Sequence, residues 1–229
     1  MDQHRPLSSL ISRAMARMGI HACVLALMLV LPIAAHAGTT SIVSGVLDFT
    51  ATAGETNSVT ITTGGGNYTV TDIVAQATPA LPCVAVGTYS VACPTTSVTV
   101  SGGTCAVTPS ITVKLMDMND TFNASGISVP MNIKGGAGND SMVGGSGNDT
   151  FDEEAAANGG DIIDGGAGTE DCVSYASRLN TSPVSIKDDG IANDGSTAVP
   201  AEADNVATTI EWYKGCLLYT SDAADDTPC

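Results

Sequence analysis

The sequence predicts an all-β protein in which a parallel β-roll follows a β-rich N-terminal region. Two adjacent nonapeptides of the form G-G-x-G-x-D-x-U-x, where U is a large apolar residue, occupy residues 135–152. Glycine, aspartate and the apolar residue recur at fixed offsets, so each unit supplies a turn, an oxygen ligand and a core residue, the pattern of calcium-binding β-rolls. Upstream lie short runs of alternating polarity, and no segment shows a helical period with caps.

Residues 38–115 form the β-rich region. Thr, Val and Ser alternate there in short runs bounded by glycine and proline, as in half-buried strands, and residues 64–67 form a turn between two runs. Aromatic residues make up only 4% of the chain, so the core must come from stacked rows of Val, Ile and Thr. We expect strands at residues 58–62, 68–71, 97–100 and 111–113.

The repeat extends on both sides of the two nonapeptides in a weaker form. An aspartate followed two residues later by an apolar residue occurs at Asp120, Asp140, Asp149, Asp161 and Asp171. The aspartate spacing is nine from 140 to 149, twelve to 161 and ten to 171. The twelve-residue step is one repeat with an insertion within residues 153–158. The period is therefore regular once and approximate elsewhere.

The nonapeptide motif suits a calcium site. Glycines at positions 1, 2 and 4 allow tight turns that point carbonyl oxygens inward, and the aspartate at position 6 supplies a charged oxygen for a hard cation. Two nonapeptides complete one turn of the solenoid, so Asp140 should stack on Asp161 and Asp149 on Asp171. A flexible Gly/Asn linker or simple hairpin turns are the alternatives, and two contiguous full motifs favour the calcium site. The predicted metal-binding residues are Gly135, Gly136, Gly138, Asp140, Gly144, Gly145, Gly147, Asp149, Asp161, Gly165, Gly166, Gly168 and Asp171.

Charge and composition exclude several classes of function. Residues 117–211 hold 17 acidic side chains against Lys134, Arg178 and Lys187. Such a segment repels itself without counterions, and it offers no basic patch for nucleic acid. All three histidines, His4, His21 and His36, precede residue 38, which removes Ser-His-Asp and Cys-His catalysis and His-bearing zinc sites from the remainder.

The two ends of the chain are expected to lie outside the fold. Residues 1–37 have a positive start, an apolar stretch and the small-x-small ending Ala35-His36-Ala37, which predicts an export signal and a secreted, extracellular protein. The apolar stretch is shorter than a membrane span requires, so we expect no membrane span. Residues 216–229 begin with CLLYTSDAAD, which is similar to the translation of a sequencing-library adapter, so we expect a non-native tail after residue 215.

Cysteine spacing favours one disulfide. Cys83, Cys93, Cys105 and Cys172 lie between the two ends, and a disulfide is permitted after export. Cys83 and Cys93 flank a short segment in which Gly87-Thr88 could turn a hairpin, so they are the preferred pair. Tetrathiolate zinc is the alternative, but the spacing lacks a C-x-x-C pair.

The chain resembles the RTX, or haemolysin-type, calcium-binding proteins of bacteria. The likeness is specific over residues 135–152 and extends to Tyr175. Residues 116–122 are similar to a degenerate entry repeat, and a segment that often follows such repeats is resembled by residues 171–178, 183–186, 188–195 and 204–206. The resemblance implies a right-handed parallel β-roll at residues 116–175 with an acidic continuation at 176–215. Two departures weaken the match: Asp161 follows Asn-Gly-Gly in place of a full G-G-x-G, and Glu170 adds an acid beside Asp171.

The expected function is calcium binding by a secreted protein with a structural or interaction role, its cell-surface or matrix partner being undefined. The alternative is the N-terminal part of a secreted enzyme or toxin, such as a protease, lipase or polysaccharide epimerase or lyase, whose catalytic domain is missing. A third hypothesis casts Tyr175 and Arg178 as catalytic residues on an acidic polysaccharide. We expect instead a packed Tyr175 and a surface ion pair at Arg178, and we predict no catalytic residue. Likewise Asp188, Asp189 and Asp194 are expected in a solvated or calcium-bound loop, and Trp212 at a core edge.

Overall fold

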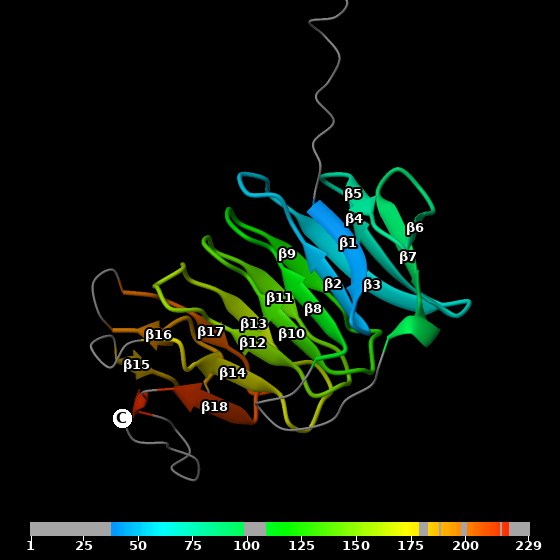
Figure 1. The fold of residues 1–229 in the computed structure, drawn as a ribbon. Helices are drawn as coiled ribbons and strands as arrows, with labels where there is room; N and C mark the ends of the chain where they lie inside the picture. The colour runs from blue at the N-terminus through cyan, green and yellow to red at the C-terminus, as the bar shows by residue number, and fades with distance from the viewer. Residues whose placement is uncertain are drawn as a thin grey trace, which may run out of the picture. The chain divides into compact units, whose positions relative to one another are not determined.

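Two large β-sheets contain most of the strands of the protein (Figure 1). The computed structural model describes residues 38–98, 109–178, 183–187, 189–197, 201–215 and 217–219. The predicted export signal and most of the predicted tail therefore lie outside the described residues. Within the described part there is no α-helix, which confirms the all-β class, and no helix there is long and apolar enough to cross a membrane.

The strand bounds follow sheet by sheet. The first sheet holds, in spatial order, β18 (Trp212–Gly215), β14 (Cys172–Tyr175), β12 (Thr150–Asp152), β10 (Met131–Lys134), β8 (Ile111–Lys114), β2 (Val46–Thr50), β1 (Gly38–Val43) and β5 (Ala77–Pro79). The second sheet holds β17 (Asn205–Val206), β13 (Ile162–Asp164), β11 (Ser141–Val143), β9 (Thr121–Asn123), β3 (Ser58–Gly64), β4 (Asn67–Asp72), β7 (Ser90–Pro94) and β6 (Val84–Ala85). A small sheet joins β16 (Gly195–Ser196), β15 (Val184–Ser185) and β19 (Leu217–Tyr219), and Thr95–Ser97 form the 3-10 helix η1.

From β8 to β14 the chain alternates between the two large sheets. β8, β10, β12 and β14 pair in parallel in the first sheet, and β9, β11 and β13 do so in the second. The register places Ile133 beside Phe151 and Met142 beside Ile163. The apolar residue of each repeat therefore stacks on the apolar residue of the next repeat in the same sheet. After β15 and β16, the chain returns to the two large sheets, where β17 pairs with β13 and β18 with β14.

The N-terminal region begins the same two sheets. β1 and β2 form one antiparallel hairpin, and β3 and β4 form another across the expected turn, with Gly64 opposite Asn67. β2 then pairs in parallel with β8, and β3 with β9. The strands expected at 58–62, 68–71 and 111–113 are β3, β4 and β8. The strand expected at 97–100 is wrong at its start, because Ser97 ends η1, and residues 99–100 lie outside the described part.

The core lies between the sheets and consists of stacked aliphatic and Phe side chains, as the shortage of aromatic residues predicts. Parallel register lets small apolar residues bury one another in rows, so few large side chains are needed. The central residues of these rows are at most 2% exposed: Leu47, Phe49, Ile111, Val113, Met131, Ile133, Phe151 and Val173 on the first sheet, and Val59, Ile61, Val70, Phe122, Met142, Ile163 and Val206 on the second.

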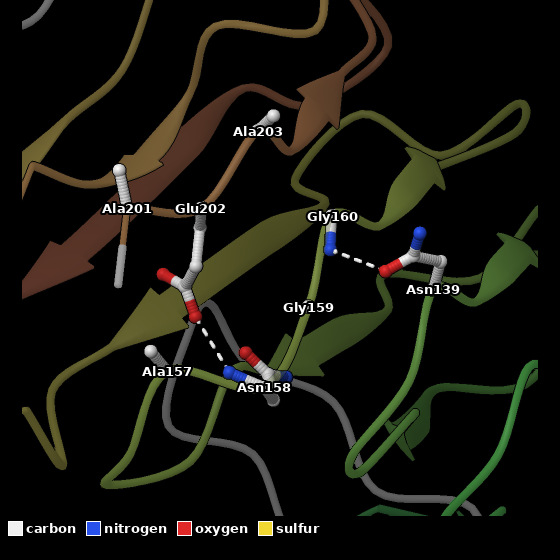
Figure 2. A pocket seen from close by; sticks show the side chains of 8 residues that line it. All are labelled: Asn139, Ala157, Asn158, Gly159, Gly160, Ala201, Glu202 and Ala203. Carbon is white, nitrogen blue, oxygen red and sulfur yellow. Dashed lines mark hydrogen bonds between the residues drawn. The ribbon is translucent and has the colours of Figure 1, made fainter. Parts of the chain in front are cut away.

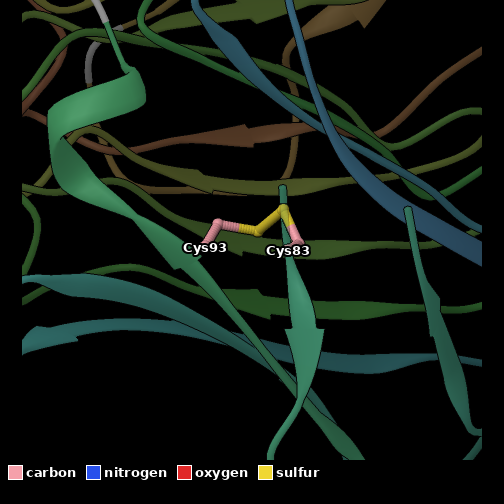
Figure 3. Close-up of a disulfide and its surroundings, with 2 residues drawn as sticks. All are labelled: Cys83 and Cys93. Atoms are coloured by element: carbon pink, nitrogen blue, oxygen red, sulfur yellow. A yellow bond between two sulfur atoms is a disulfide. The ribbon is translucent and has the colours of Figure 1, made fainter. Parts of the chain in front are cut away.

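A disulfide joins Cys83 to Cys93 at the start of the stack (Figure 3). Cys93 lies on β7, and Cys83 directly precedes β6, the neighbouring strand of the second sheet. Both cysteines are buried. The pair is the one that the sequence favoured.

Candidate metal centre

The predicted aspartates occupy the position directly before a strand in every case. We call Asp120, Asp140, Asp161 and Asp204 the first carboxylate row, since they precede the adjacent strands β9, β11, β13 and β17. We call Asp149, Asp171 and Glu211 the second carboxylate row, since they precede β12, β14 and β18. All the aspartates of both rows are at most 2% exposed, whereas Glu211 is exposed.

Hydrogen bonds connect the first carboxylate row from one repeat to the next. The backbone N–H of Asp120 donates to Oδ1 of Asp140 at 2.8 Å, and that of Asp140 donates to Oδ1 of Asp161 at 2.8 Å. The N–H of Asp161 continues the ladder to Oδ1 of Asp204 at 2.9 Å. The expected stacking of Asp140 on Asp161 is therefore present.

The second carboxylate row repeats this arrangement. The N–H of Asp149 donates to Oδ1 of Asp171 at 2.7 Å, which is the expected pairing, and the N–H of Asp171 donates to Glu211 at 2.8 Å. Residue 130 is a proline without an N–H, so Met131 supplies the donor to Oδ1 of Asp149 at 2.9 Å. Each row thus fixes one oxygen of each carboxylate by a backbone hydrogen bond.

The second oxygen of several carboxylates is buried without a hydrogen-bond donor. This holds for Oδ2 of Asp120, Asp140 and Asp171, while Oδ2 of Asp149 accepts the N–H of Gly145 at 2.7 Å. Leaving a buried polar group unpaired costs about 1–3 kcal/mol, and more for a charged group. The rows therefore present oxygens that only a proton, a water or a cation can satisfy.

Burial makes these carboxylates hard to ionise. It raises the pKa of Asp140 and of Asp149 to about 7, and the charges of their row neighbours Asp161 and Asp171 add to the rise. Backbone hydrogen bonds act in the opposite direction but do not compensate. The pKa of Asp204 is raised to about 7, and those of Asp120, Asp161 and Asp171 to about 6, again mainly by burial.

The predicted glycines lie in close contact either with a carboxylate of the rows or with the backbone of a neighbouring repeat. A Cβ at Gly135 would overlap Oδ2 of Asp140, and one at Gly165 or Gly168 would lie about 2.5–2.6 Å from Oδ2 of Asp171. At the remaining predicted positions a Cβ would meet backbone of the neighbouring repeat, mostly a carbonyl oxygen: Met116 at Gly136, Met118 at Gly138, Gly165 at Gly144, Ile127 at Gly145, Val129 at Gly147 and Gly145 at Gly166. The turns therefore place carbonyl and carboxylate oxygens side by side.

Gly138 offers a test of this packing. Its φ is +150°, and an added Cβ would overlap the carbonyl oxygen of Met118, so Gly138→Ala should lower the free energy of unfolding by about 2–4 kcal/mol. Gly126→Ala is the matched control, because a Cβ there meets no atom within 4 Å and should change stability by less than about 0.5 kcal/mol. Urea denaturation in calcium-containing buffer measures both. Equal effects of the two substitutions would contradict the close packing.

Glu153, Asp161 and Asp204 form a buried cluster that could hold a metal ion. One carboxylate oxygen of each lies within 4.8 Å of the others. The amide of Asn158 donates to Glu153 at 3.0 Å and to Asp161 at 3.3 Å, and the hydroxyl of Tyr175 donates to Asp204 at 2.8 Å. Burial raises the pKa of Glu153 well above its usual range, with the charges of Asp204 and Asp161 adding to it.

Arg178 lies beside this cluster and is buried, which corrects the expected surface ion pair. Its guanidinium contacts both carboxylate oxygens of Glu202 at 2.9 Å, and it donates to the Glu153 carbonyl and to Asn158. Arg178 is 6% exposed, because residues 153–158 wrap around it. Tyr175 is packed in β14 as expected. Arg178 therefore neutralises Glu202 and leaves three carboxylates to share the cluster.

An open pocket of about 460 Å³ lies next to the cluster (Figure 2). Asn158 and Glu202 belong both to its wall and to the surroundings of the cluster, and they are joined by a 2.7 Å hydrogen bond from the N–H of Asn158. On the opposite side Asn139 accepts the N–H of Gly160 at 3.0 Å. The pocket thus opens beside the polar groups that surround the carboxylates.

Other acidic positions separate into a buried and an exposed group. Asp194 is buried and accepts the N–H of Lys187 at 2.6 Å and of Val206 at 3.0 Å, so it belongs to the fold and not to a solvated loop. Asp189 is exposed, as expected, and Asp188 lies outside the described residues. Trp212 is half-buried on β18.

Several residues of the centre were not among the predicted ligands. Asp120 and Asp204 carry the same step of an aspartate two residues before an apolar residue, a signal that could have found both. Glu211 occupies the same position relative to Tyr213, with a glutamate in place of the aspartate. Glu153 follows no repeat, and only the structure brings it to Asp161.

No protein-family model, curated protein or solved structure matches this chain. The resemblance to RTX proteins therefore remains a prediction from the motifs of the sequence.

Proposed function

We propose that this chain is an exported calcium-binding protein of the RTX type, in which calcium between glycine-rich turns drives the folding of a right-handed β-roll. The observation that carries the proposal is the pair of carboxylate rows. In these rows the Oδ2 atoms of Asp120, Asp140 and Asp171 are buried and have no hydrogen-bond donor. The role is structural or one of interaction. Tyr175 and Arg178, the residues that a catalytic interpretation would use, are engaged with Asp204 and Glu202.

The donor set favours calcium among the common metals. Carboxylate and carbonyl oxygens surround the glycine turns, and hard oxygen ligands in irregular number suit Ca²⁺ better than Zn²⁺, which prefers nitrogen and sulfur. Mg²⁺ demands near-ideal octahedral geometry and keeps its waters. Asp140, Asp149, Asp161 and Asp171 would hold the ions together with the turn carbonyls.

Metal binding and folding would be coupled. Parallel pairing of the repeats is what brings the carboxylates of one row together, so the fold creates the repulsion that the cation then removes. An unfolded chain has no such site, and binding free energy therefore becomes folding free energy. A low-calcium cytosol would leave the chain loose, and millimolar extracellular calcium would order it. The buried Cys83–Cys93 disulfide is consistent with an oxidising compartment.

Calcium titration of the chain tests the proposal. Circular dichroism in a chelator should show little β-structure, and micromolar to millimolar calcium should raise the β signal while the hydrodynamic radius falls. Magnesium at the same concentrations is the matched control and should have a much smaller effect. An unchanged spectrum and radius between chelator and about 10 mM calcium, which exceeds the dissociation constants of about 0.1–1 mM typical of extracellular calcium sites, would refute coupled folding.

A further inference from the structure

We propose a further cation site outside the nonapeptides, where the N-terminal hairpins meet the first carboxylate row. We call it the junction site and define it as Glu55, Asn57, Asp72 and Asp120. Three of these residues belong to the β-rich N-terminal region, where the repeat pattern predicts no ligand. The inference shares its cation and Asp120 with the proposed function, but it does not depend on the nonapeptides.

Strand pairing places Asn57 at the head of the first carboxylate row. β3 pairs in parallel with β9, with Ser58 beside Thr121. Asn57 therefore lies beside Asp120 on the neighbouring strand, in the same way that Asp120 lies beside Asp140. The hydrogen bond of the row is repeated as well, since the N–H of Asn57 donates to Oδ1 of Asp120 at 2.6 Å. The row therefore extends one step upstream of the repeats.

Asp72 adds a second carboxylate to the same short segment. It ends β4, and its Oδ1 accepts the N–H of Ser58 at 3.1 Å. Asp120 and Asp72 are thus held by the consecutive amides of residues 57 and 58.

Each of the four junction residues has one buried side-chain oxygen without a hydrogen-bond donor. Among the described residues, seven buried side-chain oxygens have no hydrogen-bond partner, and four of them are Glu55 Oε2, Asn57 Oδ1, Asp72 Oδ2 and Asp120 Oδ2. Asn57, Asp72 and Asp120 are at most 1% exposed as whole residues. Two of the remaining three are Oδ2 of Asp140 and Asp171 in the carboxylate rows. The junction residues thus have the same deficit of donors as Asp140 and Asp171.

A hard divalent cation would satisfy this group. Three carboxylates and one amide oxygen give an all-oxygen donor set with excess negative charge, which suits Ca²⁺. The carboxylates are not as tightly grouped as Glu153, Asp161 and Asp204, so the site would close as the ion binds. Its closure would reinforce the pairing of β3 with β9, through which the disulfide-linked N-terminal region is attached to the repeats.

The test compares the full chain with a double variant, Glu55→Gln and Asp72→Asn. Both substitutions remove charge, and the asparagine keeps an oxygen for the N–H of Ser58. Asp48→Asn is the matched control, because Asp48 lies in the same region but pairs with Lys114 away from the junction. Native mass spectrometry counts the calcium ions bound, and hydrogen exchange follows peptides covering residues 53–60 and 135–175 with and without calcium.

We expect the double variant to bind one calcium ion fewer than the parent. Its calcium-induced protection factor at residues 53–60 should fall at least tenfold, while residues 135–175 should still become protected when calcium is added. An unchanged ion count with unchanged protection at 53–60 overturns the junction site. A parent chain that responds at 53–60 but not at 135–175 would instead overturn the proposed function and leave the junction site standing. If the metal-free exchange of the double variant differs from the parent, Glu55→Gln alone carries the same test.

Discussion

Replacing Asp140 and Asp171 together by asparagine should shift stability in opposite directions with and without calcium. In a chelator the variant should be more stable than the parent, because each substitution removes a buried carboxylate whose pKa is raised, to about 7 at Asp140 and about 6 at Asp171. The asparagine oxygen can still accept the backbone N–H that Oδ1 accepts now, from Asp120 and Asp149 respectively, and Oδ2 of neither aspartate has a donor to lose. In calcium the variant should be less stable, because two charged ligands are missing.

The expected loss of calcium affinity is at least about tenfold for each site, equivalent to about 1.4 kcal/mol. Thermal melts in chelator and in millimolar calcium, with calorimetric titration, measure the two directions. Asp152→Asn is the control, since Asp152 lies on β12, which pairs with β14 directly after Asp171, but forms an ion pair with Lys134 at 2.8 Å outside the rows. A variant that is destabilised equally in both buffers would mean that the carboxylates serve packing alone.

The reversal of sign distinguishes a metal site from a structural hydrogen-bond network. In a satisfied network both oxygens of a buried carboxylate have donors, and removing the charge destabilises the protein under all conditions. Here the Oδ2 atoms of Asp120, Asp140 and Asp171 have no hydrogen-bond donor. The metal-free fold therefore carries an electrostatic cost at these positions when they are ionised, which protonation or a bound cation offsets.

The repeated part of the fold was predictable because the nine-residue period of glycine, aspartate and apolar residue can be seen in the sequence. Two repeats span one passage through both sheets, so the spacing alone paired Asp140 with Asp161 and Asp149 with Asp171, as the hydrogen bonds show. The N-terminal region has no repeat, and alternation of polarity predicted β3 and β4 without saying that β3 would join β9. For the same reason the head of the first row at Asn57 was not foreseen.

Arg178 and Glu153 show a second limit. Their burial depends on how residues 153–158, an insertion in the repeat, wrap around the end of β14, and no local pattern encodes that contact. The only arginine of the acidic segment 117–211 indicates a surface ion pair by composition, whereas in the fold its bidentate contact to Glu202 is buried. The sequence thus predicts ligands that recur and misses those that tertiary packing supplies once.

The metal-free protein should become less stable as the pH rises from about 4 to about 7. An unfolded aspartate titrates near pH 3.9, whereas Asp140, Asp149 and Asp204 in the fold have their pKa raised to about 7. Between these values the folded state binds more protons than the unfolded state, so the free energy of unfolding falls with rising pH. Stability from these groups is complete below about pH 4 and is lost above about pH 7.

Calcium should reverse this trend, because it binds the ionised carboxylates and competes with protons. We expect the melting temperature in chelator to fall by roughly 5–10 °C between pH 5 and pH 8, which corresponds to a few kcal/mol for a chain of this size. The gain on adding millimolar calcium should be small at pH 5 and largest at pH 8. Scanning calorimetry at four pH values measures both curves. A metal-free melting temperature that rises over this range would show that the buried carboxylates are stabilised as anions by the protein itself, and the rows would then need no cation.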